Sequence, residues 1–231
     1  MKTKKIGILA LIAALITFIW GVQKVIGELA NPPAETLAGR IAAIEGGFGV
    51  FSLNYALAAL LTIACGMTLA AFSFYTRSRY PLWSTIAMTF IPVYMLANLF
   101  AYLSQVFVLP RLLELHHQPS TAALAEGLIR MSIHTWTGSA IEFINQLAYA
   151  VLGIPSIILA AQLFRMASSL RFGALCLALS GMLSILAFFG IAFQYSEAIG
   201  LSMVSGGIYT LAIAVLGCRF LSLPAHIPQA S

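Results

Sequence analysis

The residues best able to do chemistry are polar side chains set among long apolar stretches. Glu142, Asn145 and Gln146 place a carboxyl and two amides within little more than one helical turn, and His134 lies eight residues before the carboxyl. Such groups can bind a polar ligand, and a carboxyl with an imidazole can act as acid and base. A charge at the centre of a membrane helix costs about 2.5 to 3.5 kcal/mol on insertion scales, so each group should face protein, water or a ligand. These four residues are the first candidates for a ligand site.

A second set of polar residues is spaced for one face of a helix. Asn98, Tyr102 and Gln105 follow one another at steps of four and three, and Tyr94 precedes them by four. Glu45, which two glycines follow, is a further candidate nearer the membrane surface. If the helix that carries Glu142 begins a turn or two before Ile141, another single face is formed by Thr135, Ser139, Glu142, Gln146 and Tyr149.

If these two faces meet, they line a polar cavity with Glu142 as its deepest acid. Nearly all of their residues fall in the outer half of the membrane, whereas the inner halves of the spans are mostly leucine, isoleucine, alanine and phenylalanine. The alternative is that these groups hold the helices together through hydrogen bonds, each worth about 0.6 to 2 kcal/mol. We expect this packing role for Asn54, Ser139, Gln194, Ser202 and Ser205.

Metal, haem and disulfide chemistry have weaker support. His116 and His117 lie near Glu114 and are the candidate metal ligands, but their spacing fits no ligand motif, so we expect no metal site. A haem held by two histidines would need them on facing spans, and only His134 comes close to a span. We expect no cofactor, and no residue can be assigned as catalytic. No C-x-x-C spacing occurs among the three cysteines, Cys65, Cys176 and Cys218.

The elements that must position these side chains are membrane-spanning helices. Of the 231 residues 61% are hydrophobic and 8% charged, and the mean hydropathy is +0.96, values that soluble domains do not reach. A span needs roughly 20 apolar residues. We therefore predict an all-α transmembrane bundle that forms one domain over residues 1–231. Its six predicted spans are 6–22, 48–74, 82–108, 141–164, 172–193 and 199–221.

The charges predict how this bundle is oriented. Eight of the twelve lysines and arginines fall on the side of the N-terminus, which predicts cytoplasmic N- and C-termini. The seven acids all fall on the outer side or in the outer half of a span. Two longer connections lie on that side: Asn31-Pro-Pro33 must interrupt a helix, and a short surface helix is expected after Pro119-Ser120. The net charge of +5 is not clustered for nucleic acid, so the lipid bilayer is the expected partner.

Short motifs carry a resemblance to a known group of proteins. They are a lysine-tipped first span, Arg40 to Glu45 at the entry to the second span, Arg79-Tyr-Pro81 and Arg171-Phe-Gly173. This layout resembles six-span bacterial inner-membrane proteins of a family catalogued as a domain of unknown function. The resemblance implies a multi-pass protein of the bacterial inner membrane. It implies no catalytic or binding residue.

Three classes of function follow from the sequence. The first is binding or transport of a small or lipid-like molecule in an outward-facing polar cavity. The second is an accessory or assembly subunit of a membrane complex, associated with itself or with another protein. The third is a membrane-embedded enzyme that uses Glu142 and His134, although eight residues separate them by about 12 Å along a helix. Walker A, nucleophile-elbow and H-E-x-x-H motifs are absent from the sequence, which weakens this third class.

Overall fold

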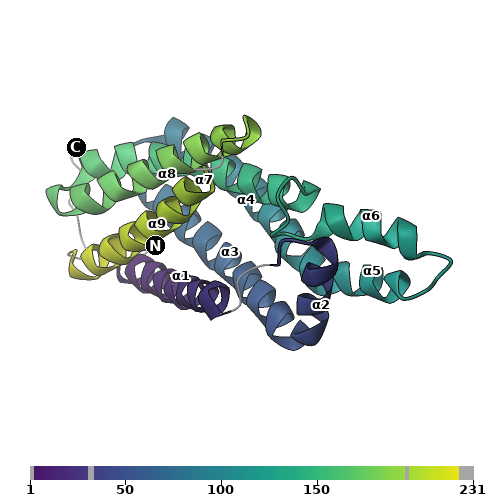
Figure 1. Cartoon of the computed structure of the whole chain (residues 1–231). Coiled ribbons are helices and arrows are strands. Elements are labelled where there is room, and N and C mark those ends of the chain that lie inside the picture. The colour runs from purple at the N-terminus through teal and green to yellow at the C-terminus, as the bar shows by residue number, and fades with distance from the viewer. Residues whose placement is uncertain (1–2, 31–33, 196–197, 224–231) are drawn as a thin grey trace.

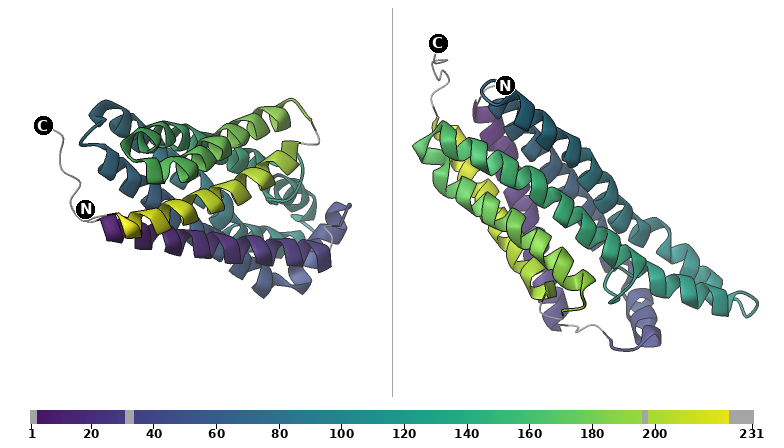
Figure 2. Two further views of the ribbon diagram at one scale, coloured as in Figure 1. Left: turned by 90° about the vertical axis from the view of Figure 1, so that its left-hand side faces the viewer. Right: turned by 90° about the horizontal axis from the view of Figure 1, so that it is seen from above.

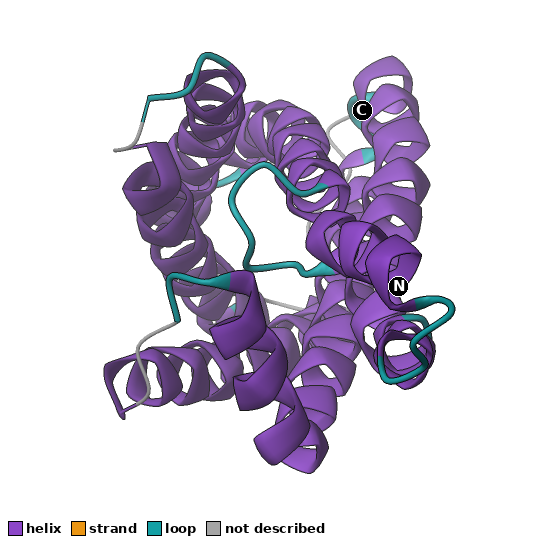
Figure 3. Ribbon diagram, turned by 45° about the vertical axis from the view of Figure 1, so that its right-hand side comes forward, coloured by secondary structure: helices purple, strands orange, loops and turns teal. Residues whose placement is uncertain are grey.

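The computed structural model describes residues 3–30, 34–195 and 198–223. Within these ranges the chain is helical and contains no strand (Figure 3). Six of its helices are long and apolar enough to cross a membrane. Those six are α1 (Thr3–Ala30), α3 (Phe48–Thr76), α4 (Pro81–Phe107), α7 (Ala140–Met166), α8 (Arg171–Ala192) and α9 (Ala198–Ser222).

Each predicted span coincides with one of these helices. Local sequence sets several of their ends. Pro81 occupies the first turn of α4, where its missing N–H costs nothing. Ser139 caps α7, its side chain accepting a hydrogen bond from the backbone N–H of Glu142. The helix therefore begins at Ala140 and not a turn or two earlier, so Thr135 does not share a helical face with Glu142. The predicted interruption at Asn31-Pro-Pro33 lies outside the described residues.

The six long helices form a closed ring around one apolar core. Following contacts around the ring, α1 packs on α3, α3 on α4, α4 on α7, α7 on α8, α8 on α9, and α9 back on α1. Figure 2 shows these helices running side by side. A further contact between α3 and α7 crosses the ring. The shared core includes Ile6, Phe72, Tyr94, Leu159, Leu177 and Phe220.

Glycine pairs bring neighbouring helices into backbone contact at two points of this ring. A Cβ atom on Gly153 would lie 2.5 Å from the carbonyl oxygen of Gly181, and one on Gly181 would lie 2.7 Å from that of Gly153. Gly7 of α1 and Gly217 of α9 approach each other in the same way. These contacts join α7 to α8 and α1 to α9 with no side chain between them.

Besides the short 3-10 helix η1 (Ser168–Leu170) between α7 and α8, three shorter α-helices of the described residues cover one end of the ring, which we call the capped end. They are α2 (Leu37–Gly46), α5 (Leu109–His116) and α6 (Ala122–Ser132), where a short surface helix was expected. A small apolar core that includes Ile41, Leu113 and Ile129 holds them together. Figure 1 shows this layer on the right and both chain ends on the left. We call that opposite end the basic end, because its turns carry Arg77, Arg79, Arg165 and Arg171.

Candidate ligand site

Aromatic and amide side chains from five parts of the chain meet in the half of the ring near the capped end. The phenol oxygens of Tyr102 on α4 and Tyr149 on α7 lie 2.6 Å apart. The ring centroid of His134 lies 5.5 Å from that of Tyr102 and 5.4 Å from that of Tyr55 on α3. The ring centroid of Trp20 on α1 lies 6.4 Å from that of Tyr102. We name this group the aromatic–amide cluster; its members are Trp20, Tyr55, Asn98, Tyr102, His134, Asn145 and Tyr149.

Gln105, which belongs to α4, fixes the position of His134 in the connection between α6 and α7. Its Oε1 accepts a hydrogen bond of 3.0 Å from the backbone N–H of His134. Its Nε2 donates to the carbonyl of Ser132 at 2.8 Å and to Ser104 Oγ at 3.0 Å. Gln105 is fully buried, and its amide holds the start of the α6–α7 connection against α4. Its role is to position His134, because both ends of the amide are already occupied.

The ring of His134 is buried and uncharged at neutral pH. Only 9% of the residue is exposed. Burial lowers its pKa from 6.5 to about 3, and repulsion from the Lys24 ammonium adds to this shift. The nearby Asn145 side chain opposes part of the shift, but its geometry does not complete a hydrogen bond to either ring nitrogen. The cluster therefore presents a neutral imidazole.

Several buried polar atoms of this cluster have no hydrogen-bond partner among the described residues. Asn98 donates through Nδ2 to Thr62 Oγ1 at 2.9 Å, yet its Oδ1 has no partner. Leaving a buried polar atom unpaired costs about 1–3 kcal/mol, so such atoms are rare in native proteins. Here five of them occur in one cluster: Trp20 Nε1, Asn98 Oδ1, His134 Nδ1, His134 Nε2 and Asn145 Oδ1.

Two of the candidates lie on other faces of α7. The Oε2 of Glu142 accepts a hydrogen bond of 2.6 Å from the backbone N–H of Gly138, so the carboxylate caps the first turn of its helix. Gln146 turns toward α9, where its Oε1 accepts a bond of 3.0 Å from Ser202. The carboxylate and His134 are not hydrogen-bonded to each other. The predicted polar stripe on α7 is therefore divided, and Asn145 is the member of the trio that joins the cluster.

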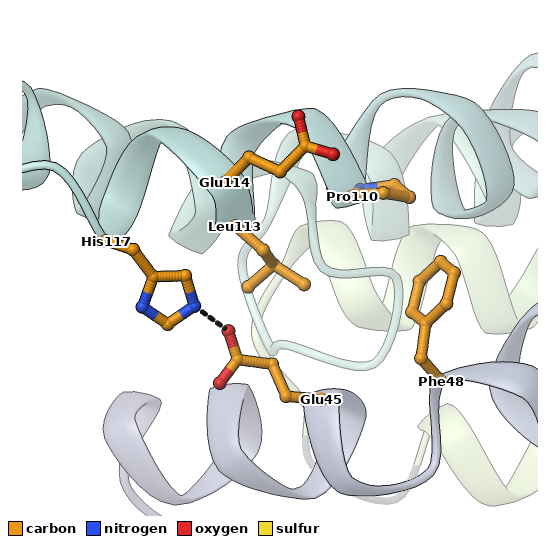
Figure 4. Close-up of a pocket in the computed structure, with 6 residues that line it drawn as sticks. All are labelled: Glu45, Phe48, Pro110, Leu113, Glu114 and His117. Atoms are coloured by element: carbon orange, nitrogen blue, oxygen red, sulfur yellow. Dashed lines mark hydrogen bonds and ion pairs between the residues drawn. The ribbon is translucent and has the colours of Figure 1, made fainter.

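Glu45 and the two neighbouring histidines lie apart from the cluster, at the surface of the capped end. His117 Nε2 and Glu45 Oε1 are 2.7 Å apart, on the edge of an open pocket of about 410 Å³ (Figure 4). A second pocket of about 280 Å³ adjoins it and includes His116. Neither pocket is lined by Glu142, Asn145 or His134. Across the described ranges, no three His, Cys, Asp or Glu side chains come together as a metal site would require.

The connection that carries His134 is fastened by an arginine that sequence reasoning did not select. Arg40 of α2 donates through Nη1 to the carbonyl of Thr135 at 3.0 Å and to Thr135 Oγ1 at 2.9 Å. Its guanidinium and that of Arg130 each lie 5.7 Å from the Trp136 ring centroid, a cation–π distance. Arg40 thus holds residues 133–139 over the aromatic–amide cluster. In the sequence, Arg40 stands seven residues after Pro33 and was named only as the start of the motif that ends at Glu45.

Replacing Arg40 with methionine is expected to loosen this connection. Loss of two charge-assisted hydrogen bonds at a partly exposed site predicts about tenfold faster hydrogen exchange, or about 1.4 kcal/mol, at the backbone amides of His134, Trp136 and Ser139. Those amides donate within the connection or to Gln105, so their exchange reports its opening. Arg111→Met is the matched control, because Arg111 pairs with Glu114 at the same end. Equal exchange in both variants would show that Arg40 does not hold the connection.

Comparison with known proteins leaves the site to be interpreted on its own geometry. No family model, no curated protein and no solved structure matches the chain. The chain is therefore described by what its residues form: six helices able to cross a membrane, and a buried aromatic–amide cluster beneath a cap that Arg40 fastens.

Proposed function

We propose that this chain is a membrane protein that binds and transports a small neutral molecule, admitted to the aromatic–amide cluster from the capped end. The five unpartnered polar atoms carry this proposal. A ligand that forms hydrogen bonds with these atoms would remove the free-energy cost of leaving them unpaired. Residues used only to hold helices together would be paired with one another, as Ser180, Ser184 and Ser205 are between α8 and α9.

The cluster's chemistry selects the class of ligand. Trp20 Nε1–H and one nitrogen of His134 offer donors, while Asn98 Oδ1, Asn145 Oδ1 and the other imidazole nitrogen offer acceptors. The surrounding rings of Tyr55, Tyr102 and Trp20 suit a flat apolar face. No carboxylate belongs to the cluster and its histidine is neutral, so a cationic ligand would lose its hydration without a counter-charge. A flat, neutral, hydroxyl-bearing molecule fits these groups best.

The placement of this protein in the cell belongs to the same proposal. We place the capped end outside the bacterial inner membrane and the basic end in the cytoplasm. The lysine and arginine distribution supports this orientation. The resemblance to six-span inner-membrane proteins supports the assignment to the bacterial inner membrane. The ligand would then arrive from outside the cell or from the outer leaflet.

One observation favours the accessory-subunit function as a second candidate. Leu124, Leu128 and Met131 form an exposed stripe along α6, at steps of four and three. An exposed apolar stripe beyond a span can mark contact with another protein. This stripe fits contact with a partner protein. An accessory-subunit function, however, would leave the unpaired polar atoms of the aromatic–amide cluster without a role. An enzymatic function has less support, since Glu142 and His134 do not pair.

Thermal unfolding with a simple probe tests the proposed function. Resorcinol is flat and neutral and carries two hydroxyls, so it should raise the unfolding midpoint saturably. At ten times its dissociation constant the stabilisation would be about 1.4 kcal/mol. Asn145→Leu removes an acceptor from the cluster and should weaken the shift. Tyr75→Phe is the matched control, because Tyr75 also has an unpartnered buried hydroxyl but lies near the basic end.

The same titration distinguishes the candidate functions. Benzylamine, which has a similar ring but a positive charge, should give no saturable shift. Equal shifts in Asn145→Leu and in the unchanged protein would mean that resorcinol acts elsewhere, and would overturn the assignment of this site.

A further inference from the structure

A second set of buried polar side chains lies at the other end of the same three helices. Thr76 Oγ1 of α3 lies 2.8 Å from Ser84 Oγ of α4, and Ser84 Oγ donates to Gln162 Oε1 of α7 at 3.1 Å. With Ser73 of α3 these residues form what we name the serine–glutamine cluster. The sequence had suggested that this half of the bundle is almost wholly apolar.

This second cluster also contains polar atoms that have no hydrogen-bond partner in the described part of the chain. Gln162 is 4% exposed, and its Nε2 has no hydrogen-bond partner. The hydroxyl of Ser73, in a residue that is 1% exposed, is unpartnered as well. A buried amide N–H needs a hydrogen-bond acceptor, and a buried hydroxyl needs a donor or an acceptor. A neutral molecule with hydroxyl groups supplies both, which is the ligand class proposed for the aromatic–amide cluster.

An apolar layer separates the two clusters. It includes Leu69 of α3, Ile91 of α4, and Leu152 and Leu159 of α7, all buried. Along α4, Asn98 and Ser84 are fourteen residues apart, or about 21 Å of helix, against a hydrocarbon thickness of about 30 Å. The two clusters therefore lie near opposite surfaces of the bilayer and not at one depth.

A proline interrupts two of the three helices within this separating layer. Pro92 lies between Ser84 and Asn98 on α4, and Pro155 lies between Tyr149 and Gln162 on α7. Proline removes the backbone hydrogen bond to the residue four positions earlier and is the commonest cause of a helix bend. The halves of α4 and α7 that carry the two clusters can thus tilt separately.

We propose that the serine–glutamine cluster is a second binding station for the same neutral ligand, so that α3, α4 and α7 form a route with one station near each membrane surface. This inference rests on the proposed function. The ligand moves between stations past the apolar layer, and the interrupted helices open one station at a time. Gln162 and Ser73 bind it at the basic end, as Asn98 and Asn145 do at the capped end.

Cysteine accessibility tests this route in membrane vesicles of both orientations. In a background of Cys65→Ala, Cys176→Ala and Cys218→Ser, single cysteines replace Ser84 or Ala58, a buried residue packed with Tyr55 and Tyr102. An anionic, membrane-impermeant methanethiosulfonate reagent is expected to modify Ser84→Cys only from the basic end and Ala58→Cys only from the capped end. Ala87→Cys is the matched control, one turn from Ser84 and fully buried in the apolar layer. It should react at least tenfold more slowly than Ser84→Cys.

Protection by resorcinol separates failure of this inference from failure of the proposed function. If both are right, resorcinol slows modification at both clusters. If Ser84→Cys reacts no faster than Ala87→Cys while resorcinol still protects Ala58→Cys, the second station is refuted and the first stands. If resorcinol protects neither position, both proposals fail. Gln162→Cys repeats the measurement at the basic end, in case Ser84→Cys perturbs folding.

Discussion

His134→Phe is expected to stabilise the protein at neutral pH. Phenylalanine keeps a ring against Tyr55 and Tyr102, while it removes two buried ring nitrogens that have no hydrogen-bond partner. Because burying an unpaired polar atom costs about 1–3 kcal/mol, the variant should gain an amount in this range. A gain in stability would indicate that His134 serves to bind a ligand. Replacing a residue that serves only helix packing would lower the stability of the protein.

The same substitution should also remove a sensitivity to acid. The pKa of His134 falls from 6.5 to about 3 on folding, so the unfolded chain takes up a proton that the folded protein excludes. Stability is therefore lost as the pH falls from about 6.5 toward 3. With about 1.4 kcal/mol for each tenfold change, the loss reaches up to about 5 kcal/mol at the lower limit. The unfolding free energy of His134→Phe should lack this part of the pH dependence.

Reversible unfolding in mild detergent, followed at pH 7.5, 6 and 4.5, measures both effects. His116→Phe is the matched control, because it makes the same exchange at the capped end but outside the aromatic–amide cluster. Lower stability of His134→Phe at pH 7.5 would contradict the unpaired state of the imidazole. A pH profile unchanged from that of the parent protein would contradict its exclusion of a proton.

Gly181→Ala is expected to destabilise the protein although it adds only one methyl group. The new Cβ atom would lie 2.7 Å from the carbonyl oxygen of Gly153, which is backbone and cannot rotate away. Helices α7 and α8 would have to separate along their contact. Overpacking of this kind costs about 1–3 kcal/mol, and the loss should outweigh the gain in helix propensity from alanine.

Thermal unfolding midpoints of Gly181→Ala and Gly206→Ala test this contact as a pair. Each kcal/mol moves the midpoint by roughly 2–4 °C in a chain of this size, so the first variant should unfold several degrees lower. Gly206 has nothing within 4 Å of the added Cβ, so its variant should be neutral or slightly stabilised. Similar losses in the two variants would mean that helix packing at Gly181 is not the cause.

The six long helices and their glycine contacts show how much of the fold can be predicted from the sequence. Long apolar runs predicted all six long helices, because a membrane span requires about 20 apolar residues and little else of that length occurs in the chain. Small residues on the last two spans were obvious in the sequence. Which of them lie in a contact was not, since Gly206 and Gly207 of α9 face open space while Gly181 of α8 meets Gly153 of α7.

For the candidate site, sequence reasoning found most members but not their grouping. Asn98, Tyr102, His134 and Asn145 were selected as polar residues among apolar ones, and they do meet. Glu142 was expected at the centre and instead caps its own helix. Helical spacing fixes the angle between two residues of one helix, but it does not say which angle faces which neighbour.

The sequence by itself determined the class of structure, the number of long helices and the stock of polar groups within them. Only the tertiary structure decided which groups come together, because contacts join residues far apart in the chain. Arg40 fastens Thr135 across 95 positions, and Ser84 meets Gln162 across 78. The rotation of each helix about its axis, set by backbone contacts such as that between Gly153 and Gly181, directs Asn145 into the cluster and Gln146 toward α9.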